Sequence, residues 1–132
     1  MTERAAHILV VDDDATVRAS LARVLAAAGH RVDAVGSGVE AVRRLGSDEF
    51  ALVVLDLRMP RLGGLTVLQH VQSRHPGVPV VVMTGFPSIE NAKESIELGA
   101  FDFLLKPLDP DRIRDVVSRA LASSPWQLQR RC

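Results

Sequence analysis

The segment Leu52-Val53-Val54-Leu55-Asp56 places four consecutive apolar residues before one acidic residue. A short run that is apolar throughout, rather than alternating with polar residues, is typical of a parallel strand covered by helices on both faces. Residues 8–11 and 80–83 form two more such runs, and residues 32–35 and 101–105 form two mixed runs. We therefore expect five strands, with residues 52–55 in the centre of the sheet.

The segments between these runs have the spacing of amphipathic helices, with apolar residues three and four positions apart. The clearest apolar stripes are Val17, Leu21, Val24 and Leu25, then Leu65, Leu68 and Val71, and finally Ile113, Val116, Val117 and Ala120. The expected N-caps are Asp14, Ser37 and Asp109, and the expected C-terminal caps are Gly29 and Gly99. Strand and helix alternate five times, which predicts an α/β fold with a parallel sheet between two helical layers.

The composition is that of one folded domain. The chain has 132 residues, 47% of them hydrophobic, with 16 basic and 16 acidic side chains and no net charge. This neutrality argues against a diffuse basic surface for nucleic acids or anionic membranes. The single cysteine, Cys132, excludes an intrachain disulfide and suits the reducing cytoplasm. We expect an extension at residues 1–6, the domain at residues 7–122 and a tail at residues 123–132.

Polar residues stand at the ends of four of the five predicted strands. Asp12 and Asp13 follow the first, Asp56 follows the third, Thr84 ends the fourth and Lys106 follows the fifth. Each has an ordinary alternative role as a turn residue, a strand end or a solvated side chain. Ligands of open α/β sheets nevertheless bind beyond the carboxyl ends of the strands. We therefore expect these side chains to form one site.

The residue types at this edge suit a divalent cation and a phosphoryl group. Mg²⁺ in proteins takes carboxylate oxygens together with waters and phosphate oxygens. A hydroxyl and an ammonium group beside it would complete a site for a tetrahedral dianion. A carboxylate can attack phosphorus to form an aspartyl phosphate. Asp56, alone at the end of its strand, is the better candidate nucleophile, whereas the adjacent Asp12 and Asp13 are better suited to the metal.

Four motifs, spread along the chain in order, resemble the receiver domain of two-component response regulators. They occupy residues 11–14, 55–60 with 63–64, 83–85 and 99–107. The resemblance covers nearly the whole chain. It implies a flavodoxin-like, doubly wound (βα)5 fold whose five parallel strands have the order 2-1-3-4-5.

The same resemblance implies the roles of the site residues. Asp56 would be the phosphoacceptor. Asp13, Asp56 and the main-chain carbonyl of Arg58 would bind Mg²⁺ or Mn²⁺ directly, and Asp12 would hold the ion mostly through water. No other cofactor is implied.

Further roles concern the bound phosphoryl group. Thr84 would donate its hydroxyl to it, and Lys106, joined to Pro107 by a cis peptide bond, would pair with another of its oxygens. Thr84 and Phe103 would act as switch residues that move inward on phosphorylation. Phe86 is expected to obstruct the water that hydrolyses the phosphoryl group.

The implied function is a signalling switch rather than an enzyme that acts on other substrates. A sensor histidine kinase or a histidine phosphotransfer protein would phosphorylate Asp56. Residues 83–90 resemble receivers of nitrogen-regulation-type transcription activators, and the sequence leaves open whether this is a complete regulator or part of a longer one. We expect a cytoplasmic protein that contacts neither membranes nor, through this chain, nucleic acid.

The output surface is expected on the fourth helix, the fifth strand and the fifth helix. Glu90, Glu94 and Glu97 would form an acidic stripe beside Arg112 and Arg119. Such a surface can pair with its own symmetry mate, which predicts a weak, salt-sensitive homodimer on phosphorylation. Two solvated helix faces are the alternative.

Two other functions fit parts of the pattern less well. A Mg²⁺-dependent phosphohydrolase with an aspartyl-phosphate intermediate would have a second acidic residue two positions after the nucleophile, where Arg58 stands. A flavin-binding flavodoxin would have a hydroxyl-rich phosphate loop after the first strand, where three aspartates stand.

Overall fold

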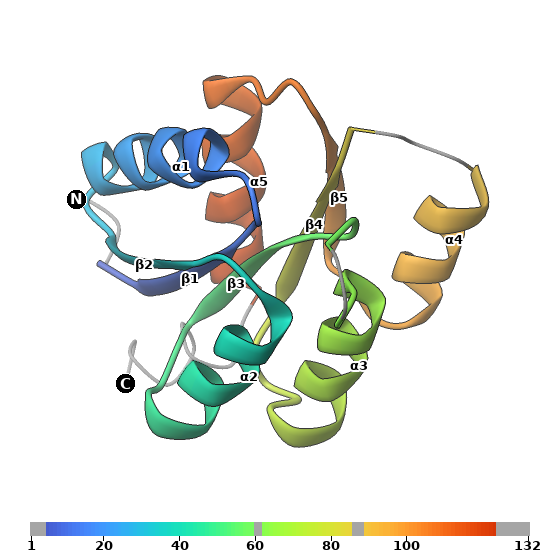
Figure 1. Cartoon of the computed structure of the whole chain (residues 1–132). Helices are drawn as coiled ribbons and strands as arrows, with labels where there is room; N and C mark the ends of the chain where they lie inside the picture. The colour runs from blue at the N-terminus through green and yellow to red at the C-terminus, as the bar shows by residue number, and fades with distance from the viewer. Residues whose placement is uncertain (1–4, 60–61, 86–88, 124–132) are drawn as a thin grey trace.

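The computed structural model describes residues 5–59, 62–85 and 89–123, with the side chains of residues 89–92 left out. Phe86 and the predicted tail beyond residue 123, including Cys132, therefore lie outside the described residues. In the described part, strands and helices alternate five times (Figure 1). The strands are β1 (His7–Val11), β2 (Arg31–Val35), β3 (Leu52–Asp56), β4 (Val80–Thr84) and β5 (Asp102–Leu105). The helices are α1 (Ala15–Ala27), α2 (Gly38–Ser47), α3 (Gly64–Arg74), α4 (Ile89–Glu97) and α5 (Pro110–Ala122).

All five strands pair in parallel, in the order β2-β1-β3-β4-β5. This confirms the predicted fold class and the central place of β3. Each strand differs by one residue from its predicted run. Strands β1 and β2 begin one residue earlier, at His7 and Arg31, and β5 begins at Asp102 rather than Phe101. Strands β3 and β4 also include the polar residues Asp56 and Thr84 at their ends. Phe101 still bonds to the sheet, since its N–H donates to the Val80 carbonyl at 2.7 Å.

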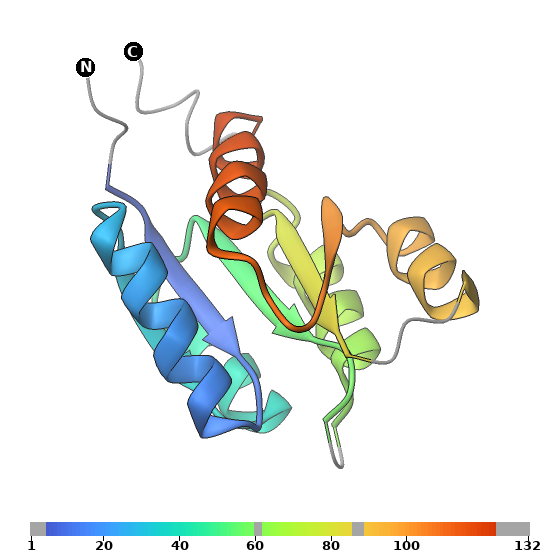
Figure 2. The ribbon, with the colours of Figure 1, turned by 90° about the horizontal axis from the view of Figure 1, so that it is seen from above.

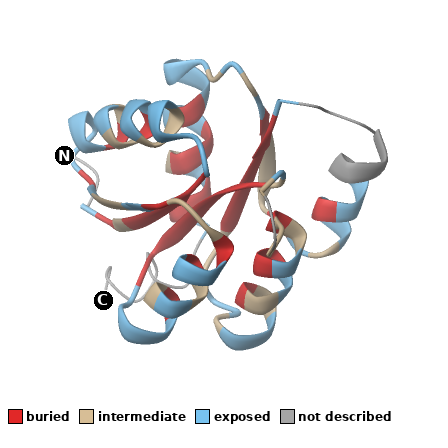
Figure 3. Ribbon diagram, in the orientation of Figure 1, coloured by how far each residue is buried: buried red, intermediate tan, exposed pale blue. Residues whose placement is uncertain are grey.

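Helices cover the sheet on both faces. Helices α1 and α5 pack on one face, where their apolar side chains join those of β1, β3 and β4 in one core cluster (Figures 1 and 2). Helices α2 and α3 cover the other face with a second cluster, and α4 lies beside the edge strand β5. Strands β3 and β4 are buried along their whole length, which explains their uninterrupted apolar sequences (Figure 3).

Local sequence signals set the ends of the helices. The Asp14 side chain accepts hydrogen bonds from the N–H groups of Thr16 and Val17 at the start of α1. Ser37 and Asp109 cap α2 and α5 in the same way, as predicted. Gly29 and Gly99 follow α1 and α4 with φ angles of 96° and 101°, a left-handed conformation that suits glycine.

This topology brings the carboxyl ends of all five strands to one edge of the sheet. Within the described segments, no helix is long and apolar enough to cross a membrane.

Candidate functional site at the carboxyl edge of the sheet

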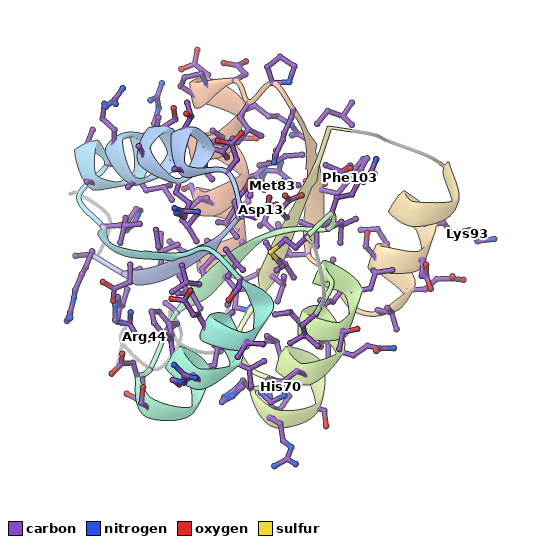
Figure 4. The ribbon with its side chains drawn as sticks, viewed as in Figure 1. Asp13, Arg44, His70, Met83, Lys93 and Phe103 are labelled. Carbon is purple, nitrogen blue, oxygen red and sulfur yellow. The ribbon has the colours of Figure 1, made fainter. Side chains whose placement is uncertain are left out.

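Three carboxylates converge where β1 and β3 end. One oxygen from each of Asp12, Asp13 and Asp56 lies within 4.8 Å of the others. Asp12 and Asp56 are buried, with exposed fractions of 0% and 3%, whereas Asp13 is exposed. Figure 4 shows Asp13 where β1 runs into α1. A compact set of oxygen ligands, with no nitrogen or sulfur ligand, fits a hard divalent cation such as Mg²⁺.

Asp12 is held at every polar position. One of its carboxylate oxygens accepts the N–H of Asp14 at 2.9 Å, and the other accepts the Lys106 ammonium at 2.7 Å. Its own N–H donates to the Val35 carbonyl at 3.2 Å, and its carbonyl accepts the Arg18 guanidinium at 2.8 Å. The buried carboxylate is therefore fixed in place by β2, α1 and the residue after β5.

Asp56 also faces donors on both carboxylate oxygens. The Arg58 N–H lies 3.1 Å from one oxygen, and the Lys106 ammonium lies 3.3 Å from the other. Burial raises the pKa of Asp56 above its usual value, and the negative charge of Asp12 adds to this effect. The Arg58 N–H and Lys106 oppose it without cancelling it. The charged form of the Asp56 carboxylate is therefore destabilised in the folded protein, and a bound cation would stabilise it.

Lys106 is the cation that faces both buried carboxylates. Burial of its ammonium group works to lower its pKa, but the hydrogen bond to Asp12 and the charges of Asp56 and Asp12 outweigh this, so the pKa lies above its usual value. The peptide bond from Lys106 to Pro107 is cis, as predicted. The main-chain N–H of Lys106 donates a hydrogen bond to the Thr84 carbonyl at 2.9 Å, and this bond joins the ends of β4 and β5.

Thr84 and Phe103 occupy the neighbouring strands. Thr84, the last residue of β4, is 1% exposed. Phe103 is half-buried in β5, pairs in register with Val82 and packs against the core cluster under α2 and α3 (Figure 4). The structure therefore brings Asp12, Asp13, Asp56 and Lys106 into one cluster and places Thr84 at the same edge.

Two residues near the site received no role from the sequence. A Cβ atom on Gly64 would lie 2.4 Å from the Asp56 carbonyl oxygen, so only glycine allows α3 to begin against the backbone that carries Asp56. Gly64 was part of a recognised motif, which was the available signal. Arg18 reaches the Asp12 carbonyl from α1, and its six-residue distance from Asp12 gave no such signal.

The predicted output surface differs in one respect from the expectation. The side chains of Arg112 and Arg119 lie 3.7 Å and 3.6 Å from the carboxylate of Asp102 in β5, and Arg119 also pairs with Asp115. The basic stripe on α5 is therefore partly neutralised within the chain. Glu94 and Glu97 are exposed on α4, and the side chain of Glu90 lies outside the described residues.

A cavity of about 850 Å³ lies at the opposite, amino edge of the sheet. His7, Arg31, Asp48 and His75 are among the residues that line it, and none of the predicted site residues does. The chemistry at the carboxyl edge therefore rests on the charged cluster and not on this cavity.

Comparison with known proteins agrees with this geometry. The family model described as the response regulator receiver domain matches residues 8–118. The chain is 38% identical over 115 residues to the transcriptional regulatory protein ZraR of Salmonella typhimurium, covering 87% of this chain and 26% of the relative. It is 37% identical over 124 residues to the DNA-binding transcriptional regulator NtrC of Escherichia coli, covering 94% of this chain and 26% of that protein.

A solved structure of similar size gives the same answer. The CheY-like receiver domain protein of Methanospirillum hungatei is 26% identical and superposes with a TM-score of 0.87, covering 91% of this chain and 96% of its own. The chain spans about a quarter of the length of the curated relatives. The comparisons give no support to the phosphohydrolase alternative. This chain, with its acidic cluster at the end of a 2-1-3-4-5 parallel sheet, belongs to the response regulator receiver family of two-component signalling.

Proposed function

We propose that this domain accepts a phosphoryl group on Asp56 in a Mg²⁺-dependent reaction. The observation that carries the proposal is the position of Asp56, which is buried at the end of the central strand between two further carboxylates and one ammonium group. A buried carboxylate whose anionic form is disfavoured by its surroundings gains from a bound cation.

The residues present fit a divalent cation. Asp12, Asp13, Asp56 and the main-chain carbonyl of Arg58 would hold Mg²⁺ or Mn²⁺. Once bound, the ion would reduce the repulsion between the Asp56 carboxylate and an incoming phosphoryl group.

The chain's own groups supply the other steps. A carboxylate oxygen of Asp56 forms a bond to phosphorus while the bond from phosphorus to the donor's histidine nitrogen breaks, and that nitrogen keeps the electron pair. The Thr84 hydroxyl and the Lys106 ammonium then bind oxygens of the phosphoryl group. Lys106 would exchange its bond to Asp56, which is 3.3 Å long in this structure, for a phosphoryl oxygen.

The partner and setting follow from this chemistry. The donor would be a sensor histidine kinase or a histidine phosphotransfer protein in the cytoplasm. The domain would act as a switch, catalysing only its own phosphorylation and dephosphorylation, and it would control its output through α4, β5 and α5, with Thr84 and Phe103 moving inward. Net neutrality supports the absence of direct nucleic acid or membrane binding by this chain. The relatives' names support transcription regulation as the output of a longer protein.

Phosphorylation of Asp56 would favour a weak homodimer through the surface formed by α4, β5 and α5. Arg112 and Arg119 already contact Asp102, so a partner's acidic side chains would have to compete with it. Light scattering at low salt, with and without beryllofluoride, tests this step. An activated protein that stays monomeric at high micromolar concentration would exclude the dimer.

Intact-mass measurement tests the phosphoacceptor. With Mg²⁺ and acetyl phosphate, the wild-type protein should gain one acid-labile phosphoryl group, and chelation of Mg²⁺ should prevent this. Asp56→Asn should gain none, while Asp48→Asn, at the opposite edge of the sheet, should behave as the wild type. Equal phosphorylation of Asp56→Asn and the wild type would place the nucleophile elsewhere.

A further inference from the structure

Arg18 of α1 contacts the main chain at the end of β1 rather than an acidic side chain. It is half-buried, and its Nη1 atom donates a hydrogen bond to the main-chain carbonyl of Asp12 at 2.8 Å. Across the described part of the chain, no carboxylate oxygen lies within ion-pair distance of its guanidinium group. Arg18 therefore binds a carbonyl even though Asp12, Asp13 and Asp14 all lie at the same end of the helix.

The carbonyl that Arg18 binds belongs to the peptide between two of the clustered carboxylates. A peptide unit is planar, so a hydrogen bond to the Asp12 carbonyl also orients the N–H and Cα of Asp13. The bond from the Asp14 N–H to the Asp12 carboxylate closes a turn around the same peptide, and Arg18 is the side chain that holds the carbonyl of that peptide. Together, the turn and the Arg18 hydrogen bond set the direction in which the exposed Asp13 side chain leaves the backbone.

The neighbouring backbone leaves room for this contact. A Cβ atom on Gly36 would lie 3.0 Å from Arg18 Nη1 and 3.6 Å from Cζ. Gly36 directly follows β2, so the guanidinium lies between the end of β2 and the end of β1. An alanine here would push the guanidinium by a few tenths of an ångström, because 3.0 Å is shorter than an ordinary carbon–nitrogen contact.

We infer that Arg18 is a positioning residue for the metal site: through the Asp12–Asp13 peptide it holds the carboxylates of Asp12 and Asp13 in the arrangement that meets Asp56. This inference rests on the proposed function. It goes beyond it by giving a role to a residue that touches neither the cation nor the phosphoryl group. By binding a carbonyl, Arg18 orients the ligands without neutralising them.

The sign of the effect separates positioning from simple charge. A positive side chain near a divalent cation repels it, so an arginine that acted only through its charge would weaken Mg²⁺ binding, and its removal would tighten binding. If Arg18 positions the ligands, its removal should instead weaken Mg²⁺ binding. Loss of groups that orient metal ligands typically weakens metal affinity about 10-fold to 100-fold.

The test is a Mg²⁺ titration of the folded protein, followed by amide chemical shifts or calorimetry. Arg18→Met keeps most of the side-chain length but removes the donors, and should weaken Mg²⁺ binding about 10-fold. Arg18→Lys, which keeps the charge and one donor group, should recover part of this loss. The matched control is Arg23→Met, an exposed arginine on the same helix, which should bind Mg²⁺ as the wild type does.

Gly36→Ala provides an independent route to the same contact. It should also weaken Mg²⁺ binding, though less than Arg18→Met does, because it displaces the guanidinium without removing it. The double variant with Arg18→Met should bind no more weakly than Arg18→Met alone, because both changes act on the same hydrogen bond. Unchanged or tighter Mg²⁺ binding by folded Arg18→Met would overturn the inference and leave the proposed function intact. If the wild-type protein binds no Mg²⁺, the inference about Arg18 and the proposed function are both wrong.

Discussion

The Lys106 ammonium lies 2.7 Å from a carboxylate oxygen of Asp12, a fully buried residue 94 positions earlier in the chain. The same ammonium lies 3.3 Å from Asp56. Three clustered carboxylates and one ammonium leave this group with two excess negative charges. The stability of the folded protein should therefore change in opposite directions when the Asp56 carboxylate is removed and when the Lys106 ammonium is removed.

Asp56→Asn should stabilise the metal-free protein. The pKa of Asp56 is raised in the folded state by burial, so its contribution to stability is present below the unfolded pKa and is lost as pH rises through the folded pKa. At neutral pH the folded protein carries the cost of the buried anion, and the amide should remove about 1 kcal/mol of it. Urea unfolding without Mg²⁺ checks this, and the gain over the wild type should shrink as pH falls toward about 4. A less stable variant at pH 7 would show that the anion is well compensated.

Lys106→Met should destabilise the protein much more strongly. It leaves the buried Asp12 carboxylate without its 2.7 Å partner, and breaking a buried pair from one side costs about 3 kcal/mol or more. Adding Asp12→Asn to Lys106→Met should recover a large part of the loss, because the unpaired charge is removed. A double-mutant cycle in urea measures this coupling. Strictly additive losses would mean that the two side chains do not interact.

Mg²⁺ should stabilise the folded protein through the exposed Asp13. At a concentration ten times the Kd, a ligand that binds only the folded state adds about 1.4 kcal/mol. Asp13→Ala should abolish both this gain and phosphorylation. Its metal-free stability should equal or slightly exceed that of the wild type, because one of three clustered anions is gone. Because Lys106 already pairs with Asp12, any increase should be small. A metal-free loss of several kcal/mol would instead give Asp13 a structural role.

The fold and most of the site could be predicted from the sequence because both depend on local signals and one topological rule. The apolar run at residues 52–55 marked the central strand, and the residue after each strand was bound to reach the same edge. Side-chain pairings between distant residues left no such signal. His7 lies opposite Arg31 in the sheet register, yet its ring bonds to Asp33, two positions further along β2. Arg18 binds a main-chain carbonyl, and because every residue has one, the sequence does not indicate which carbonyl it binds.

The contact between His7 of β1 and Asp33 of β2 makes a pH-dependent contribution to the stability of the folded protein. The His7 Nε2 atom lies 2.6 Å from an Asp33 carboxylate oxygen, and Arg44 of α2 donates to the same oxygen at 2.8 Å. The hydrogen bond from His7 lowers the pKa of Asp33, burial opposes this, and Arg44 lowers it further. A lowered pKa in the folded state gives stability that is present above the unfolded pKa and is lost as pH falls through the folded pKa.

Asp33→Asn should therefore destabilise the protein by about 1 kcal/mol at pH 7, where it loses charge-assisted hydrogen bonds from two elements. The difference from the wild type should shrink as pH falls below the unfolded pKa of about 3.9 and through the lower folded pKa, where Asp33 of the wild type also becomes neutral. Asp48→Asn is the matched control: Asp48 pairs with the same Arg44 at 2.9 Å but is exposed, so its loss should cost about 0.5 kcal/mol or less. Urea unfolding across this pH range measures both variants. Phosphorylation of Asp56 should be unaffected in each, because these contacts lie outside the acidic cluster. Equal losses for the two variants at every pH would show that Arg44 alone, and not His7, sets the contribution of Asp33.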